Sequence, residues 1–226
     1  MVDIIDGLKK CGISENAASS LAEKMEAYIK EIALFNSAYN LTNTSDRDEL
    51  LVRHIFDSLA AWPVISKFVA ETCESSAENC VIADIGSGGG LPGIPLAAAF
   101  AVSGFDKVRI ELVERMEKRC AFLENCAAIL GLKKVTVVNS EAERVSEGAY
   151  DLITFRAFRP LDKKMTKTLL RIVKENGHLC AYKAKSENIK EEMSGITALV
   201  PQYKVEPLAV PGLENSERNL VVIKRS

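Results

Sequence analysis

The residues that most clearly suggest chemistry form a glycine-rich run, DIGSGGGLPG, at positions 84–93. Gly86, Gly88 and Gly90 have no side chain, so the backbone can turn tightly there and approach a ligand closely. The run follows a short apolar segment, and ligands of open α/β sheets bind beyond the carboxyl ends of the strands. A glycine loop by itself occurs in many nucleotide-binding proteins, and a purely structural turn is the alternative interpretation.

The spacing within this run separates two classes of ligand. A dinucleotide-binding loop has the pattern Gly-x-Gly-x-x-Gly, whose last glycine packs the following helix against the strand. Leu91 stands at that third position and Pro92 follows it, which disfavours an NAD-type oxidoreductase. Asp84 instead precedes the first glycine by two residues. Its carboxylate would repel a pyrophosphate but suits a ligand that carries a sulfonium or amino group.

Further acidic residues lie where a second and a third strand are expected to end. Glu114 follows an apolar segment at 108–113, and its two carboxylate oxygens match the two hydroxyl groups of a ribose. Capping of the following helix is the alternative interpretation of Glu114. After the third segment, the stretch 139–143 places a carboxylate within reach of an adenine amino group, and we favour Ala142 and Glu143 for this contact.

Other kinds of catalytic site are missing from the sequence. The six cysteines form no Cys-x-x-Cys pair and the two histidines are far apart, so we expect free thiols and no metal. Arg156, at the end of the fourth expected strand, is the candidate for a positioning role at the active-site edge, with a structural ion pair as the alternative. His54 and Asp57 share one face of a predicted helix, where they either fix the helix or contact substrate.

Alternating helices and strands must position these residues. Apolar side chains at helical spacing predict an N-terminal helical extension over residues 1–75, with a polar loop at 71–79. From there on, residues 76–226 predict the core of a single α/β domain with a Rossmann-like, mostly parallel seven-stranded sheet and helices on both faces. The expected strands are 81–85, 108–113, 135–138, 151–155 and 178–182, with a closing hairpin of 203–208 and 219–223. The expected core helices end near 101 and span 118–130 and 161–174.

Charge and hydropathy restrict the partners. The chain has a net charge of −2 and lacks both a signal-peptide profile and the roughly 18-residue apolar run of a membrane helix, so we expect a cytoplasmic protein with no membrane partner. From residue 156 onward, however, 14 Lys and Arg face 8 Asp and Glu. This excess predicts an RNA-facing patch, with solvated helix faces as the alternative. The residues expected to form the patch are Lys163, Lys164, Lys167, Arg171 and Lys174 on one helix, and Lys183, Arg218 and Lys224 near the mouth of the site.

Several further segments, together with the glycine run, resemble a known family. They are NLT at 40–42, RHIFDSL at 53–59, GSGGGLPGIP at 86–95, FRAF at 155–158, YK at 182–183 and RNL at 218–220. These segments span nearly the whole chain in order and are similar to the bacterial small-subunit ribosomal RNA guanine-N7 methyltransferases, also called glucose-inhibited division protein B. The sequence departs from the family at Ala184, where a glycine after the lysine is usual.

The resemblance implies a class I methyltransferase fold and methyl transfer from S-adenosylmethionine to N7 of one guanine in 16S ribosomal RNA. It implies 16S RNA or the small ribosomal subunit as partner, and we expect a monomer. Guanine N7 has a free lone pair and no proton, so alignment and exclusion of water suffice without a general base. The alternatives are a different methyl acceptor, or a non-catalytic RNA-binding or assembly protein that retains the fold. Carried over by position, the cofactor contacts are Gly86, Leu91, Ala142, Glu143 and Arg156, with Asp84, Gly88 and Glu114 as further parts of the pocket.

Overall fold

A seven-stranded sheet forms the centre of the computed structural model, which describes residues 2–75, 79–157 and 160–225. The strand order is β3-β2-β1-β4-β5-β7-β6. The first five strands in this order run parallel, and β7 and β6 are antiparallel to their neighbours. The mostly parallel sheet and its closing hairpin are therefore confirmed. The strands are β1 (Cys80–Ile85), β2 (Val108–Glu114), β3 (Val135–Asn139), β4 (Tyr150–Arg156), β5 (Val173–Lys183), β6 (Lys204–Pro207) and β7 (Asn219–Lys224).

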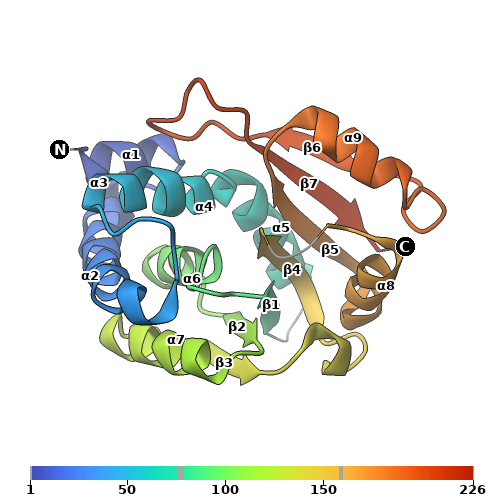
Figure 1. The fold of residues 1–226 in the computed structure, drawn as a ribbon, viewed down its shortest axis with the longest axis horizontal. Coiled ribbons are helices and arrows are strands. Elements are labelled where there is room, and N and C mark those ends of the chain that lie inside the picture. The colour runs from blue at the N-terminus through green and yellow to red at the C-terminus, as the bar shows by residue number, and fades with distance from the viewer. Residues whose placement is uncertain (1, 76–78, 158–159, 226) are drawn as a thin grey trace.

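Helices cover both faces of the sheet, as the sequence predicts (Figure 1). Successive strand residues point to opposite faces, so Ile82 joins one hydrophobic cluster and Ala83 the other. The first cluster contains α1 to α7, and the second contains α8 and α9. The helices are α1 (Ile4–Lys10), α2 (Glu15–Tyr39), α3 (Arg47–Leu50), α4 (Asp57–Leu59), α5 (Trp62–Ser75), α6 (Gly93–Val102), α7 (Glu117–Ile129), α8 (Lys163–Ile172) and α9 (Ser186–Ser194), with a π-helical turn at Leu51–Phe56 and a 3-10 turn at Ala142–Arg144.

Short polar side chains fix the starts of several helices. The carboxylate of Asp46 accepts from the backbone N–H of Glu49 at 2.9 Å, and that of Asp162 accepts from Met165 N at 2.7 Å. Such caps satisfy N–H groups that have no partner within the helix. The polar loop before residue 47 thus supplies the expected cap for α3.

Two predicted boundaries are wrong. Part of the loop expected at 71–79 is helical, since α5 continues to Ser75, and residues 76–78 lie outside the described residues. The helix expected over 161–174 ends at Ile172, and Lys174 therefore lies on β5. The last carbonyls of α8 accept from Gly148 N at 3.0 Å and Ala149 N at 2.9 Å, so contacts with a distant segment decide where this helix ends. The helix α9 was not predicted.

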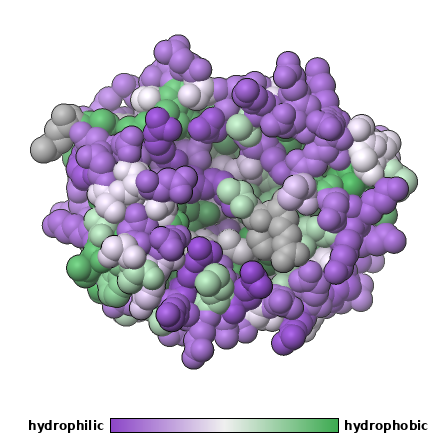
Figure 2. All heavy atoms as spheres, in the orientation of Figure 1, coloured by the Kyte–Doolittle hydropathy of each residue, from purple (hydrophilic) through white to green (hydrophobic). Residues whose placement is uncertain are grey.

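The N-terminal helices bury their apolar side chains in the same cluster as the sheet. Leu21 and Met25 of α2 are fully buried beside residues of α6 and α7. Hydrophilic residues cover most of the face shown in Figure 2, and apolar residues appear there only in small separate patches. Within the described ranges, no helix has both the length and the apolar character needed to cross a membrane.

Candidate functional site

Two cavities meet at the carboxyl end of β4. The larger is a cleft of about 880 Å³, and the smaller is a pocket of about 210 Å³. Ala157 lines both. Its φ of +50° is left-handed, a conformation that costs a non-glycine residue roughly 1–2 kcal/mol and that clusters at functional sites. The backbone just after β4 is therefore the junction between the two cavities.

The smaller pocket collects residues from the ends of four strands. Its wall includes Gly86 after β1, Glu114 at the end of β2, and Ala142 and Glu143 after β3. These four were predicted as ligand contacts from three separate segments, and the fold brings them together. Arg115, Met116, Arg119, Ser140 and Glu141 complete the polar part of the wall.

The three left-handed glycines of the loop have different surroundings. Gly86, Gly88 and Gly90 have φ values of 70°, 57° and 89°. A Cβ on Gly90 would lie 2.6 Å from Cγ1 of Ile94 and 2.9 Å from the Tyr28 hydroxyl. A Cβ on Gly88 would meet nothing closer than 3.8 Å. Gly90 is therefore required by packing, whereas the space beside Gly88 is open.

Glu114 is tied to the backbone of both neighbouring loops. Its side chain is buried, with Oε2 accepting from Gly88 N at 3.0 Å and Oε1 from Met116 N at 2.9 Å. Met116 directly precedes α7, so the second contact is of the kind that the helix-cap interpretation requires. The carboxylate also fixes the glycine loop against the end of β2. Its contact with a ribose stays a prediction.

Asp84 and Leu91 lie behind the loop and do not line the small pocket. Asp84 is 1% exposed, and its Oδ2 accepts from Gly93 N at 3.0 Å. Its Oδ1 has no hydrogen-bond partner, and burial raises the pKa of this carboxyl to about 7. Leu91 is packed into the first hydrophobic cluster. The structure thus gives both residues a part in shaping the loop, and their contact with a ligand stays a prediction.

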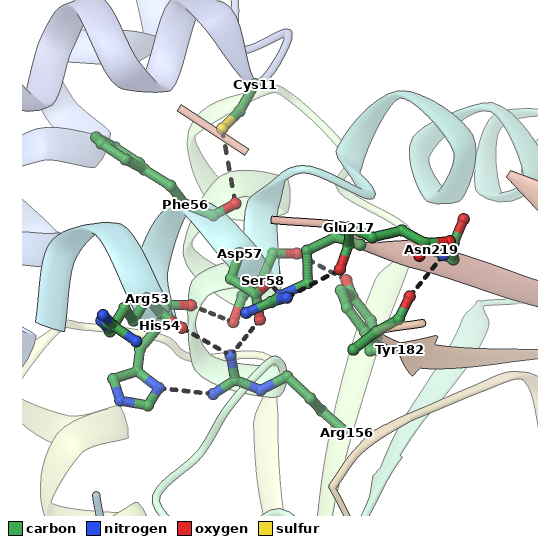
Figure 3. A network of polar contacts seen from close by, with 12 residues as sticks. Cys11, Arg53, His54, Phe56, Asp57, Ser58, Arg156, Tyr182, Glu217 and Asn219 are labelled. Atoms are coloured by element: carbon green, nitrogen blue, oxygen red, sulfur yellow. Dashed lines mark hydrogen bonds and ion pairs between the residues drawn. The ribbon is translucent and has the colours of Figure 1, made fainter. Parts of the chain in front are cut away.

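Arg156 points into a polar network on the wall of the large cleft (Figure 3). Its Nη1 lies 2.7 Å from Oδ2 of Asp57, and its Nη2 donates to Nδ1 of His54 at 3.1 Å. The other oxygen of Asp57 accepts from Nε of Arg218 at 3.0 Å. One buried carboxylate thus joins two guanidinium groups. The side chain of Arg156 lines the cleft and not the small pocket.

His54 is neutral in this network. Burial, and next the positive charge of Arg156, lower its pKa to about 4. A guanidinium has no acceptor atom, so Nδ1 accepts and the ring proton is on Nε2. Because Arg156 occupies the basic nitrogen, His54 is not available as a general base. The pair His54 and Asp57 was predicted to fix a helix or touch substrate, and both residues instead orient Arg156.

The predicted basic residues are only partly gathered at the cleft. Lys183 lines it, but its ammonium group is paired with Glu192 at 2.7 and 2.8 Å. Lys224 was expected near the mouth, and this is wrong. It pairs in register with His178, whereas Asn219 at the other end of β7 pairs with Lys183. Antiparallel pairing therefore places Lys224 at the far end of the sheet.

The expected row of basic residues along α8 is also shorter than predicted. Lys163, Lys164 and Lys167 are exposed on the helix. Arg171 donates to the backbone carbonyl of Glu143 at 3.1 Å. Lys174 pairs with Asp151 at 2.9 Å at the amino end of β4. Only the first part of α8 thus presents free ammonium groups.

Several residues of the two cavities were not predicted. Arg53 and Lys185 add positive charge to the cleft, and Ala157 and Arg119 line the pocket. Arg53 and Ala157 stand within the quoted segments at 53–59 and 155–158, of which Phe158 lies outside the described residues. Among the described residues, no group of His, Cys, Asp and Glu has the arrangement of a metal site. The cysteines at 11, 80, 120, 126 and 180 are free and buried, and the side chain of Cys73 lies outside the description.

The glycine loop yields a prediction about folding stability. Alanine at Gly90 and at Gly88 pays a similar conformational cost of about 1–2 kcal/mol, but only Gly90→Ala also overpacks the core, by roughly 1–3 kcal/mol more. Urea denaturation should therefore show a clearly lower free energy of unfolding for Gly90→Ala than for Gly88→Ala. Equal losses would mean that the loop has the same freedom at both positions.

The shared carboxylate yields a second prediction. Asp57→Ala leaves two guanidinium groups without their common partner, and breaking a buried pair costs about 3–5 kcal/mol. Denaturation should show a loss of this order. Asp106→Ala is the control, because Asp106 is 99% exposed and lies 3.7 Å from Lys134, and it should leave stability nearly unchanged. A similar small effect of both substitutions would refute the role of Asp57.

Comparison with known proteins gives the same arrangement a family. The family described as rRNA small subunit methyltransferase G matches residues 21–221. A protein from Treponema denticola described as ribosomal RNA small subunit methyltransferase G is 40% identical, with 98% of this chain and 93% of that protein covered. A protein of the same description from Borrelia turicatae is 31% identical, with 99% of both chains covered.

Solved structures show the same fold at much lower identity. A SAM-dependent methyltransferase from Aquifex aeolicus superposes with a TM-score of 0.53 at 18% identity, over 79% of this chain and 93% of that chain. This likeness supports the Rossmann-like methyltransferase fold, and the sequence comparisons identify the family. The chain belongs to the rRNA small subunit methyltransferase G family.

Proposed function

We propose that this protein transfers the methyl group of S-adenosylmethionine to N7 of a guanine in 16S ribosomal RNA. The observation that carries the proposal is the junction at Ala157, where a small pocket with the glycine loop opens beside a large cleft with basic walls. A methyl donor in the pocket and a base in the cleft would meet at this point. The family resemblance names guanine N7 as the acceptor.

The residues of the small pocket fit such a cofactor. The open space beside Gly88 is a cradle that any Cβ would reduce, and Gly86 continues it. Glu114 is placed for the ribose, and Ala142 and Glu143 for the adenine. Bound S-adenosylmethionine supplies an electrophilic methyl carbon on a positively charged sulfur. The buried carboxyl of Asp84, with Oδ1 unpartnered, would favour this positive charge through the loop.

Transfer to guanine N7 demands little acid–base chemistry from the protein. The N7 lone pair forms the new bond to the methyl carbon, the carbon–sulfur bond breaks, and its electrons remain on the sulfur. No proton leaves the base, which suits a cleft whose histidine is neutral and held by Arg156. The residues around Ala157 would act by alignment and by excluding water.

The cleft offers positive charge to an RNA backbone. Arg53 and Lys185 are exposed on its wall, and Arg218 adds a partly exposed guanidinium. Pro160 also lines the cleft, and Lys163 and Lys164 follow it closely in the chain. We propose that these groups hold ribosomal RNA, free or in the small subunit. We further propose that the protein works as a monomer in the cytoplasm.

Methylation of purified small subunits from a strain lacking this protein tests the function. Tritiated S-adenosylmethionine should label 16S RNA, and chain cleavage specific for N7-methylguanosine should map the label to one nucleotide. Gly88→Val is the control, since its side chain fills the cradle, and it should lose both cofactor binding and label. Label at another atom would show a different acceptor. Cofactor binding without transfer would indicate an assembly protein, and absence of binding would overturn the proposal.

Charge reversal tests the RNA surface. Lys163→Glu with Lys164→Glu should weaken RNA binding and flatten its salt dependence by roughly 0.7–0.9 log units per lost phosphate contact. Cofactor affinity should not change, since exposed charges are screened beyond about 10 Å at 0.1 M salt. Lys204→Glu with Lys224→Glu is the matched control, with the same charge change on β6 and β7. Equal effects of both pairs would assign the RNA contact to overall charge alone.

A further inference from the structure

Arg119 is a positive charge in the wall of the small pocket without an acidic partner. It lies in the first turn of α7. Its Nη1 is 3.8 Å from the position that a Cβ on Gly88 would take. Its Nη2 makes one long hydrogen bond, 3.3 Å to the carbonyl oxygen of Asn40. Its Nε is buried and has no hydrogen-bond partner.

This environment is unfavourable for a guanidinium group. Arginine stays charged at all ordinary pH values, and a partly buried charge needs a counter-charge or full hydrogen bonding. The acidic side chain nearest along the pocket wall, Glu114, has both oxygens engaged by the backbone N–H groups of Gly88 and Met116. Arg119 makes no ion pair within the described part of the chain. The geometry therefore lacks an anion directly beside Gly88.

We propose that Arg119 binds the carboxylate of the methionine part of S-adenosylmethionine. This inference rests on the proposed function, because the carboxylate is the one anionic group of that cofactor. The planar guanidinium can give a carboxylate two parallel hydrogen bonds, and the missing side chain of Gly88 leaves room for the ligand to approach. Arg119 and Glu114 would then recognise opposite ends of the same molecule, the amino acid and the ribose.

A pair of ligands that differ only in this group tests the inference. Decarboxylated S-adenosylmethionine keeps the sulfonium, the amine and the adenosine but lacks the carboxylate. In calorimetry, Arg119→Met should weaken S-adenosylmethionine binding about ten- to a hundredfold and leave the affinity for the decarboxylated compound nearly unchanged. Arg119→Lys should restore part of the loss, since it keeps the charge.

Lys118→Met is the matched control, because Lys118 is the exposed neighbour on the same helical turn. It should change neither affinity. Equal weakening of both ligands by Arg119→Met would show that Arg119 only holds the loop at Asn40, and would overturn the inference. If the wild-type protein binds neither ligand, the proposed function itself fails, and this outcome is distinct from failure of the Arg119 assignment.

Discussion

The carboxylate of Asp57 is the contact on which the shape of the large cleft depends. Its two oxygens bind guanidinium groups from Arg156 at the end of β4 and from Arg218 just before β7. Both contacts form only when the helical segment 51–59 and the two strands are packed correctly. Because two positive charges share one negative charge, this wall retains positive potential, which suits a polyanionic partner.

The glycine loop combines a structural and a ligand-binding requirement in a few residues. Behind the loop, the hydroxyl of Tyr28 donates to the carbonyl of Gly89, and Gly90 is packed against Ile94. In front, the space beside Gly88 is open. The N-terminal helices thus support the small pocket without lining it. A loop held on one side can keep a ligand-shaped surface on the other.

The charges of the two cavities match the two reactants. In the small pocket, a backbone-anchored carboxylate and an unpaired guanidinium suit a cofactor that carries both charges. In the cleft, basic residues predominate, and the neutral His54 leaves no proton acceptor beside Arg156. Both properties fit methyl transfer to a lone pair, because such a reaction needs two reactants held in line more than it needs acid–base catalysis.

The sequence by itself determined the α/β class and the glycine loop, because strand and helix periodicity and the need for glycine are local properties. It could not determine the end of α8, which distant backbone donors decide, or the place of Lys224, which depends on strand direction. Asp57 meets Arg156 and Arg218 across 99 and 161 residues of chain. The unpaired state of Arg119 likewise depends on which side chains the fold brings near it. Only tertiary packing decides such contacts, because spacing along the chain does not limit which distant residues meet.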